Sequence, residues 1–308
     1  MDARRRWLLS LVLAVSAATV PPPTVLAAPR PPQAALAGYA ESIGAWRAKR
    51  EAGLRAEDGW LTLVGLSWLD EGANRVGTDP ASEVLLPAGS APRSLGVITL
   101  AGGTATFSPA PGTAVRVNGR PARTQVLRPQ PGDYDVVTAG TLTFFVIKRG
   151  SRVGVRVRDS NSPSRQHFAG LRVYPIREEY RVAGRFTPHA ASTTIMIPNV
   201  LGAVEAWPTP GTVTFTLGGR DYTLQPVLDG PDAKELFFIF RDLTTGDGTY
   251  PGGRFLYASM PVNGEVVLDF NKAENPPCAF TPYATCPVPP KENALPIRIE
   301  AGERDPHR

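Results

Sequence analysis

The residue types best suited to chemistry lie toward the C-terminus of this 308-residue chain. A glycine-rich connection carries two of them, and the run VVLDFNKA after it carries a carboxylate and an amide at alternate positions. Connections of this kind often bear ligand contacts. A guanidinium, carboxylates and aromatic rings together predict a polar pocket for a small anionic or carbohydrate-like ligand. The candidate ligand-binding residues are Tyr250, Arg254, Asp269, Asn271, Asn293 and Glu303.

The same residues allow two other interpretations. Asp269 or Glu303 could be the general base of a hydrolase, with Arg254 stabilising developing negative charge. Alternatively, the residues form a buried hydrogen-bond network that ties an irregular, Pro-rich segment onto a sheet, because no β-ladder satisfies the backbone of such a segment. Spacing alone does not place Asp269 and Glu303 in one cleft, so the sequence leaves open whether the protein is an enzyme.

A row of arginines in the run RVGVRVRD forms a second candidate site. Arg152, Arg156 and Arg158 share parity, so they project from one face of a strand while valines occupy the other. Guanidinium groups bind carboxylates and phosphates, and His167 follows in a polar stretch. This face could be the contact surface of a protein-interaction scaffold, or simply a solvated face whose arginines pair with acidic neighbours.

Cys278 and Cys286 are the only cysteines, in the run NPPCAFTPYATCPVPP. Their spacing is not CxxC, which excludes a thioredoxin-like redox motif. A tetrahedral zinc site would need further ligands nearby, and the chain has three scattered histidines. We therefore expect a Cys278–Cys286 disulfide and neither a metal nor another cofactor. The motifs GxSxG, HExxH and the P-loop do not occur.

The N-terminal segment has the pattern of a secretory signal peptide. Basic Arg4 to Arg6 precede an apolar run that is shorter than the roughly 20 residues needed to span a bilayer, and small residues follow. We expect a signal peptide at 1–27, a Pro-rich leader at 28–33, and a periplasmic or extracellular protein of the bacterial envelope whose mature chain does not span the membrane. The net charge of +5 does not indicate a nucleic-acid partner, and the oligomeric state does not follow from the sequence.

The elements that must position these residues are mostly strands. Residues 34–57 have apolar side chains at spacings of three and four, which predicts one amphipathic helix. Short runs rich in Val, Thr, Leu and Phe follow, separated by Gly, Pro, Asn and Asp, which is typical of an all-β protein. The run TFTLGGRDYTL predicts a hairpin through Gly218 and Gly219. We expect two β-sandwich or barrel-like modules, at 58–175 and 176–304; the alternative is one continuous sandwich with shared sheets.

Residues 72–147 resemble a forkhead-associated (FHA) domain, a β-sandwich that binds phosphothreonine peptides. The resemblance lies in a glycine turn, the VNG turn at Val117 to Gly119, and the closing hairpin PGDYDVVTAGTLTFFV. It implies the fold for these residues. The arginine that the family places after its first glycine is Thr78 here, and the Ser-Arg-x-His segment is not matched, so the resemblance does not imply the same binding activity.

The mature chain as a whole resembles the bacterial family catalogued as domain of unknown function 1684. The motifs that carry this resemblance are GWLTLVGLSWLDEGANRVG, VRVRD, FAGLRVYP, TYPGGRFLYA and LDFNKAENPPCAFTPYATCPVPPKENAL. The resemblance implies that the polar C-terminal constellation belongs to the family's pattern. It implies no established activity.

Overall fold

The computed structural model describes residues 33–308. The predicted signal peptide, and all of the predicted leader except its last residue, lie outside the described residues. Strands in several sheets dominate the fold, and one long helix, α1 (Gln33–Arg55), precedes them. The predicted all-β class with one N-terminal helix is confirmed. The described residues contain no helix long and apolar enough to cross a membrane.

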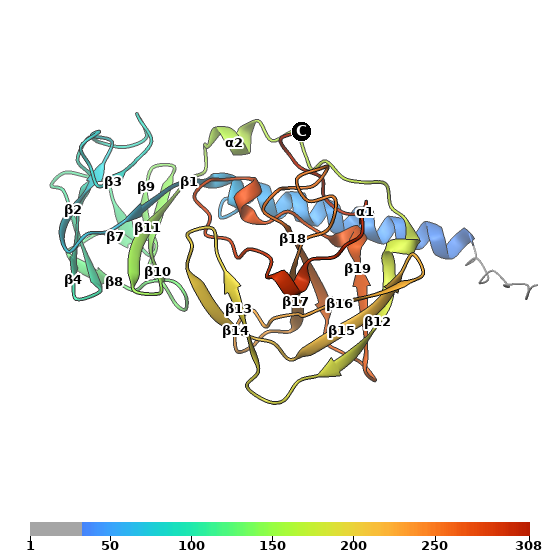
Figure 1. Ribbon diagram of the computed structural model, residues 1–308. Helices are drawn as coiled ribbons and strands as arrows, with labels where there is room; N and C mark the ends of the chain where they lie inside the picture. Colours follow the sequence, from blue (N-terminus) through green and yellow to red (C-terminus); the bar gives the residue numbers. More distant parts are fainter. Residues whose placement is uncertain (1–32) are drawn as a thin grey trace, which may run out of the picture.

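The first half of the chain folds into two sheets that face each other (Figure 1). One sheet has the order β1-β11-β10-β9-β6-β7, and the other has the order β3-β2-β4-β5-β8. The strands of the first sheet are β1 (Leu63–Trp68), β6 (Arg116–Val117), β7 (Arg120–Pro121), β9 (Val137–Ala139), β10 (Leu142–Arg149) and β11 (Arg152–Asp159). Those of the second are β2 (Gly72–Gly77), β3 (Val84–Leu85), β4 (Gly96–Ala101), β5 (Thr104–Pro109) and β8 (Gln125–Leu127).

Alternating apolar residues of these strands form one core between the two sheets. Phe107 of β5 and Phe144 of β10 meet edge to face there, with ring centroids 5.7 Å apart. Val155 and Val157 of β11 point into the same core and are fully buried. Because side chains alternate along a strand, burial of these valines directs the neighbouring arginines to the opposite face of the sheet.

The second half contains one four-stranded sheet and two hairpins. The sheet has the order β16-β15-β12-β19, and the hairpins are β13-β14 and β17-β18. The strands are β12 (Arg181–Pro188), β13 (Thr194–Pro198), β14 (Val204–Pro208), β15 (Gly211–Leu217), β16 (Arg220–Leu224), β17 (Glu235–Phe240), β18 (Arg254–Ser259) and β19 (Glu265–Asp269). Gly218 and Gly219 have φ of 59° and 75°, and they join β15 to β16 in the two-residue turn that the sequence predicts.

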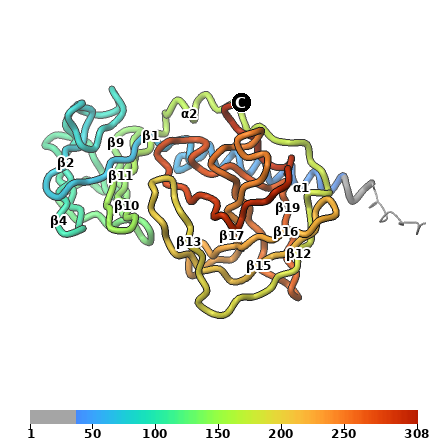
Figure 2. The backbone as a smooth tube through the Cα atoms, viewed as in Figure 1, coloured from blue at the N-terminus to red at the C-terminus, as the bar shows by residue number. Residues whose placement is uncertain are grey.

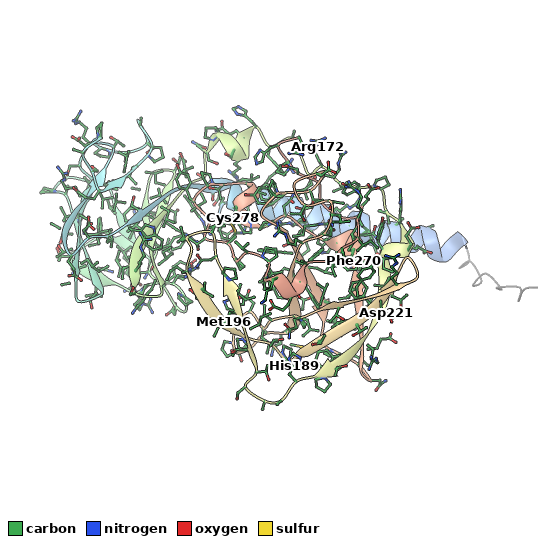
Figure 3. All side chains as sticks on the ribbon, in the orientation of Figure 1. Arg172, His189, Met196, Asp221, Phe270 and Cys278 are labelled. Atoms are coloured by element: carbon green, nitrogen blue, oxygen red, sulfur yellow. A yellow bond between two sulfur atoms is a disulfide. The ribbon has the colours of Figure 1, made fainter. Side chains whose placement is uncertain are left out.

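Short helical turns and irregular segments complete the fold. They are η1 (Trp60–Thr62), α2 (Pro163–Gln166), η2 (Glu178–Tyr180), η3 (Phe270–Lys272), η4 (Pro277–Ala279) and η5 (Lys291–Asn293). Cys278 and Cys286 are joined in a disulfide, with Cα atoms 6.2 Å apart, as expected from the sequence. Figure 3 labels Cys278 on the segment that carries η4.

The two halves of the chain do not share a sheet within the described residues. One core contains side chains from residues 69–157, and two further clusters contain side chains between residues 180 and 301. The division of the chain at residues 175 and 176 stays a prediction. Helix α1 comes first in the chain, yet it lies along the second half, beside the C-terminal segments (Figures 1 and 2).

Candidate functional site

A groove of about 760 Å³ lies between β18 and β19, and α1 contributes to its wall. We call it the acidic groove. Trp46 of α1 and Tyr257 of β18 supply aromatic surface. Glu235, Glu265, Asp269 and Glu274 supply four carboxylates, against two cations, Arg181 and Lys272. The charged lining therefore has a formal net charge of −2, which disfavours an anionic ligand and favours one rich in hydrogen-bond donors.

Of the residues predicted to form the polar C-terminal pocket, Asp269 lines this groove. It is the last residue of β19, and one of its oxygens accepts a hydrogen bond of 2.8 Å from the Tyr39 hydroxyl of α1. Burial and the neighbouring carboxylate raise the pKa of Tyr39 well above its usual value of 10. Tyr39 therefore remains a neutral donor at physiological pH and holds the carboxylate in place.

Asn271 lies behind Asp269, fully buried at the start of the irregular C-terminal segment. Its side-chain amide donates to the Tyr39 hydroxyl at 2.9 Å and to the Arg177 backbone carbonyl at 2.7 Å. Its side-chain oxygen accepts from the backbone N–H of Arg177 at 3.0 Å. Asn271 thus joins the segment before β12 to α1 and does not line the groove.

Glu274 is a further carboxylate of the groove, and burial raises its pKa. Its backbone pairs with Phe255 of β18 through hydrogen bonds of 2.9 and 2.8 Å, which hold the residue at the groove wall. Arg50 of α1 lies 3.2 Å from the Glu274 carboxylate and 3.0 Å from that of Glu303. One guanidinium faces the half-buried Glu274 and the buried Glu303, so it neutralises only one of the two carboxylates. Burial, opposed by Arg50 and reinforced by Glu303, raises the pKa of Glu274 to about 7.

Glu303 is buried, does not line the groove, and is positioned by backbone contacts. It is 1% exposed, and it accepts a hydrogen bond of 2.7 Å from the backbone N–H of Asn275. Burial raises its pKa, and Arg50 opposes that shift. The preceding Gly302 has φ of 75°, and a Cβ there would contact the carbonyl oxygens of Phe270 and Ala273. Glycine at 302 is therefore required for Glu303 to reach Arg50.

The other predicted pocket residues lie elsewhere, in contacts that serve the fold. Arg254 is 1% exposed, and its guanidinium pairs with Asp242 at 2.8 Å and donates to the Ile299 and Ala301 carbonyls. The Tyr250 hydroxyl donates to the Cys278 carbonyl at 3.0 Å. Asn293 bonds to both backbone groups of Gln225, and to the Ile239 carbonyl. None of these three lines the groove, so here the interpretation as a buried structural network fits.

The predicted arginine row is not a uniform solvated face. Arg152 is exposed, Arg158 is half-buried, and Arg156 is buried. Each guanidinium lies over an aromatic ring, Arg152 over Trp68 at 4.1 Å. None of the three forms an ion pair within the described residues. The expected pairing with acidic neighbours is therefore wrong, because cation–π contacts take its place. His167 lies exposed at the end of α2, outside the groove.

Sequence reasoning missed the contribution of helix α1 and of Glu274. Arg50 occupies the apolar face of an amphipathic helix, and a charged residue in that place indicates a buried partner. The position of Arg50 on that face could therefore have predicted that it pairs with buried acidic residues. Glu274 stands in the quoted run LDFNKAEN, but nothing in the run distinguishes it from the other polar residues. Among the described residues, His, Cys, Asp and Glu side chains form no group of three that could hold a metal ion.

Comparison with known proteins identifies the family of this chain. Residues 166–304 match the family model described as "Protein of unknown function (DUF1684)". The solution structure of an uncharacterized protein of Haloarcula marismortui is 32% identical, covering 46% of this chain and 78% of its own, with a TM-score of 0.39. The chain belongs to the DUF1684 family. No curated protein matches it.

Two solved FHA-domain structures are also similar to part of the chain. The FhaA FHA domain, solved in a complex, is 20% identical and covers 30% of this chain and 97% of its own, with a TM-score of 0.22. A second FHA-domain structure is 22% identical and covers 32% of this chain and 96% of its own, also with a TM-score of 0.22.

Proposed function

We propose that the protein binds a small, hydroxyl-rich ligand, such as a saccharide, in the acidic groove. The observation that carries this proposal is the lining of four carboxylates and two aromatic side chains around a volume of about 760 Å³. Carboxylates accept hydrogen bonds from hydroxyl groups, and aromatic faces pack against the apolar face of a ring. The volume lies within the range of small-molecule sites.

A saccharide panel tests this function. Maltose, cellobiose and chitobiose, each titrated calorimetrically into the protein, should include at least one ligand that binds. Glu274→Gln should weaken that binding about tenfold or more, because Glu274 would lose an acceptor oxygen in the groove. Glu292→Gln is the matched control, since Glu292 is exposed and lies outside the groove. If no sugar binds, or if both variants weaken binding equally, the proposal fails.

A hydrolase is the second candidate, and Glu274 favours it. A carboxyl with a pKa of about 7 can serve as a general acid or base at neutral pH. Neither Arg254 nor Glu303 lines the groove, and both are buried. The catalytic pair of this alternative is therefore Glu274 with Asp269. The same variant separates the candidates: a hydrolase with Glu274→Gln keeps its substrate affinity and loses turnover, whereas a binding protein loses affinity.

The place of action in this proposal is the bacterial envelope, reached through a cleavable signal peptide. The support is the basic, apolar and small-residue pattern of the first 27 residues. A disulfide between Cys278 and Cys286 fits an oxidising compartment. Intact-mass measurement of the protein from a periplasmic extract should give a chain that begins at Ala28. A full-length chain recovered from the cytoplasmic fraction would contradict export.

A further inference from the structure

A second cavity of about 500 Å³ lies where the two halves of the chain meet, and we call it the junction cavity. Strands β10 and β11 supply Lys148, Arg149 and Arg156 on one side. Trp207 of β14 and Phe237 of β17 lie on the other. The cavity therefore needs both halves of the chain. Tyr257 lines both this cavity and the acidic groove.

Arg156 is the unusual residue of the junction cavity. It is 5% exposed, and no ion pair within the described residues involves it. Its guanidinium donates to the Thr285 hydroxyl at 3.0 Å and lies 5.6 Å from the Trp60 ring centroid. Its Nε atom is buried and has no hydrogen-bond partner among residues 33–308. A buried cation without a counter-charge is costly, and an anion bound in the cavity would offset that cost.

The net charge of the cavity lining around Arg156 suits a ligand with one negative charge. Lys148 and Arg149 add two cations to the lining, and Glu205 and Asp229 add two carboxylates. The balance is three cations to two carboxylates, a surplus of +1. Burial, with repulsion from Arg149 and Arg158, lowers the pKa of Arg156 to about 10. Arg156 nevertheless stays charged at neutral pH, so the surplus is present when a ligand arrives.

Three aromatic side chains lie on the opposite wall of the junction cavity. The rings of Phe237 and Tyr257 are stacked, with centroids 4.7 Å apart and planes 9° apart. Trp207 lies beside them, its ring centroid 6.3 Å from that of Phe237. Tyr257 is 38% exposed although its ring is stacked. Exposed aromatic faces of this kind pack best against another flat, apolar group.

We infer that the junction cavity binds a small monocarboxylate with a flat ring as its body. The carboxylate accepts hydrogen bonds from the terminal N–H groups of the Arg156 guanidinium, in the bidentate manner that suits this pair. The ring lies against the aromatic wall of Trp207 and Tyr257. A volume of about 500 Å³ accommodates a ligand of this size.

Naphthalene-2-carboxylate is the probe, and its neutral amide, 2-naphthamide, is the counter-probe. Each is titrated calorimetrically into the full mature protein. The carboxylate should bind at least tenfold more tightly than the amide, because the amide has the same ring and lacks the charge. The inference is overturned if the two compounds bind equally, or if the carboxylate gives no binding at millimolar concentration.

Variants on strand β11 locate the site. Arg156→Met should weaken binding of naphthalene-2-carboxylate at least tenfold, and should leave the unfolding temperature unchanged or higher, since it removes an unpaired buried charge. Arg158→Met is the matched control: Arg158 has the same parity on the same strand but lies over Phe145, outside the cavity. Equal weakening by both variants would overturn the assignment. The comparison of carboxylate and amide on the unaltered protein decides the question even if a variant fails to fold.

Discussion

At the scale of single residues, the acidic groove depends on one guanidinium that serves two carboxylates. Arg50 lies within 3.2 Å of both Glu274 and Glu303. Two carboxylates, one half-buried and one buried, share one cation, so one negative charge is left unpaired and desolvation penalises it. Glu274 therefore holds its proton up to a pH of about 7. Its pKa of about 7 also makes Glu274 a groove residue able to exchange a proton near neutral pH.

Stability should consequently depend on pH through Glu274. Its pKa in the folded protein, about 7, lies above the ordinary value of 4.5, so the folded state binds the proton more tightly than the unfolded chain. The free energy of unfolding should fall as pH rises from about 4.5 to 7, by up to about 3 kcal/mol, and the loss should be complete above that range. Glu274→Gln should flatten this part of the curve. Urea denaturation at a series of pH values between 4.5 and 8 measures the free energy of unfolding of both proteins.

The control for this prediction is another carboxylate of the same groove. Glu265 is exposed, so Glu265→Gln should leave the pH dependence as it is in the unaltered protein. If Glu274→Gln and the unaltered protein show parallel curves, Glu274 does not carry the shift and its assignment as an acid or base fails with it.

At the scale of elements, helix α1 belongs to the second half of the molecule although it precedes the first. Tyr39 bonds to Asp269 and Arg50 pairs with Glu303, contacts that span 230 and 253 positions of the chain. The Arg47 guanidinium donates to the Tyr174 carbonyl at 3.0 Å. Without the helix, Glu303 would lose its cation, and Asp269 and Asn271 would lose the hydroxyl between them.

Deletion of residues 33–57 should therefore destabilise the second half selectively. Removing the partner of a buried carboxylate costs about 3–5 kcal/mol. The first core, which contains side chains from residues 69–157, does not include the helix and should keep its stability. Amide hydrogen exchange measures the stability of each half separately. Protection from exchange should fall in β12 to β19 and persist in β1 to β11. Uniform loss of protection would show that the two halves unfold as one unit.

At the scale of the whole molecule, the contact between the two halves creates what neither half has alone. None of the three arginines of β11 forms an ion pair within the described residues, and all three lie over aromatic rings. Arg156 is buried where the second half packs against this sheet, and Thr285, close to the disulfide, contacts it. The junction cavity is therefore a property of the packing of two halves and not of one strand.

The sequence by itself determined the elements and the pairing of the cysteines. Apolar periodicity predicted the helix and the strands, glycine pairs predicted a hairpin, and the choice of Cys278 and Cys286 followed because no other cysteine exists. These features depend on neighbours a few positions apart, or on composition, and both can be read from a chain without its fold.

The tertiary structure decided which polar residues share a site. Asp269 lines the acidic groove, whereas Arg254, only 15 positions before it, is buried in a pair with Asp242. Glu274 became a candidate because Arg50, from the far end of the chain, faces it together with Glu303. Burial and charge at a side chain depend on segments brought together over more than 200 positions, and the local pattern around a residue does not contain them.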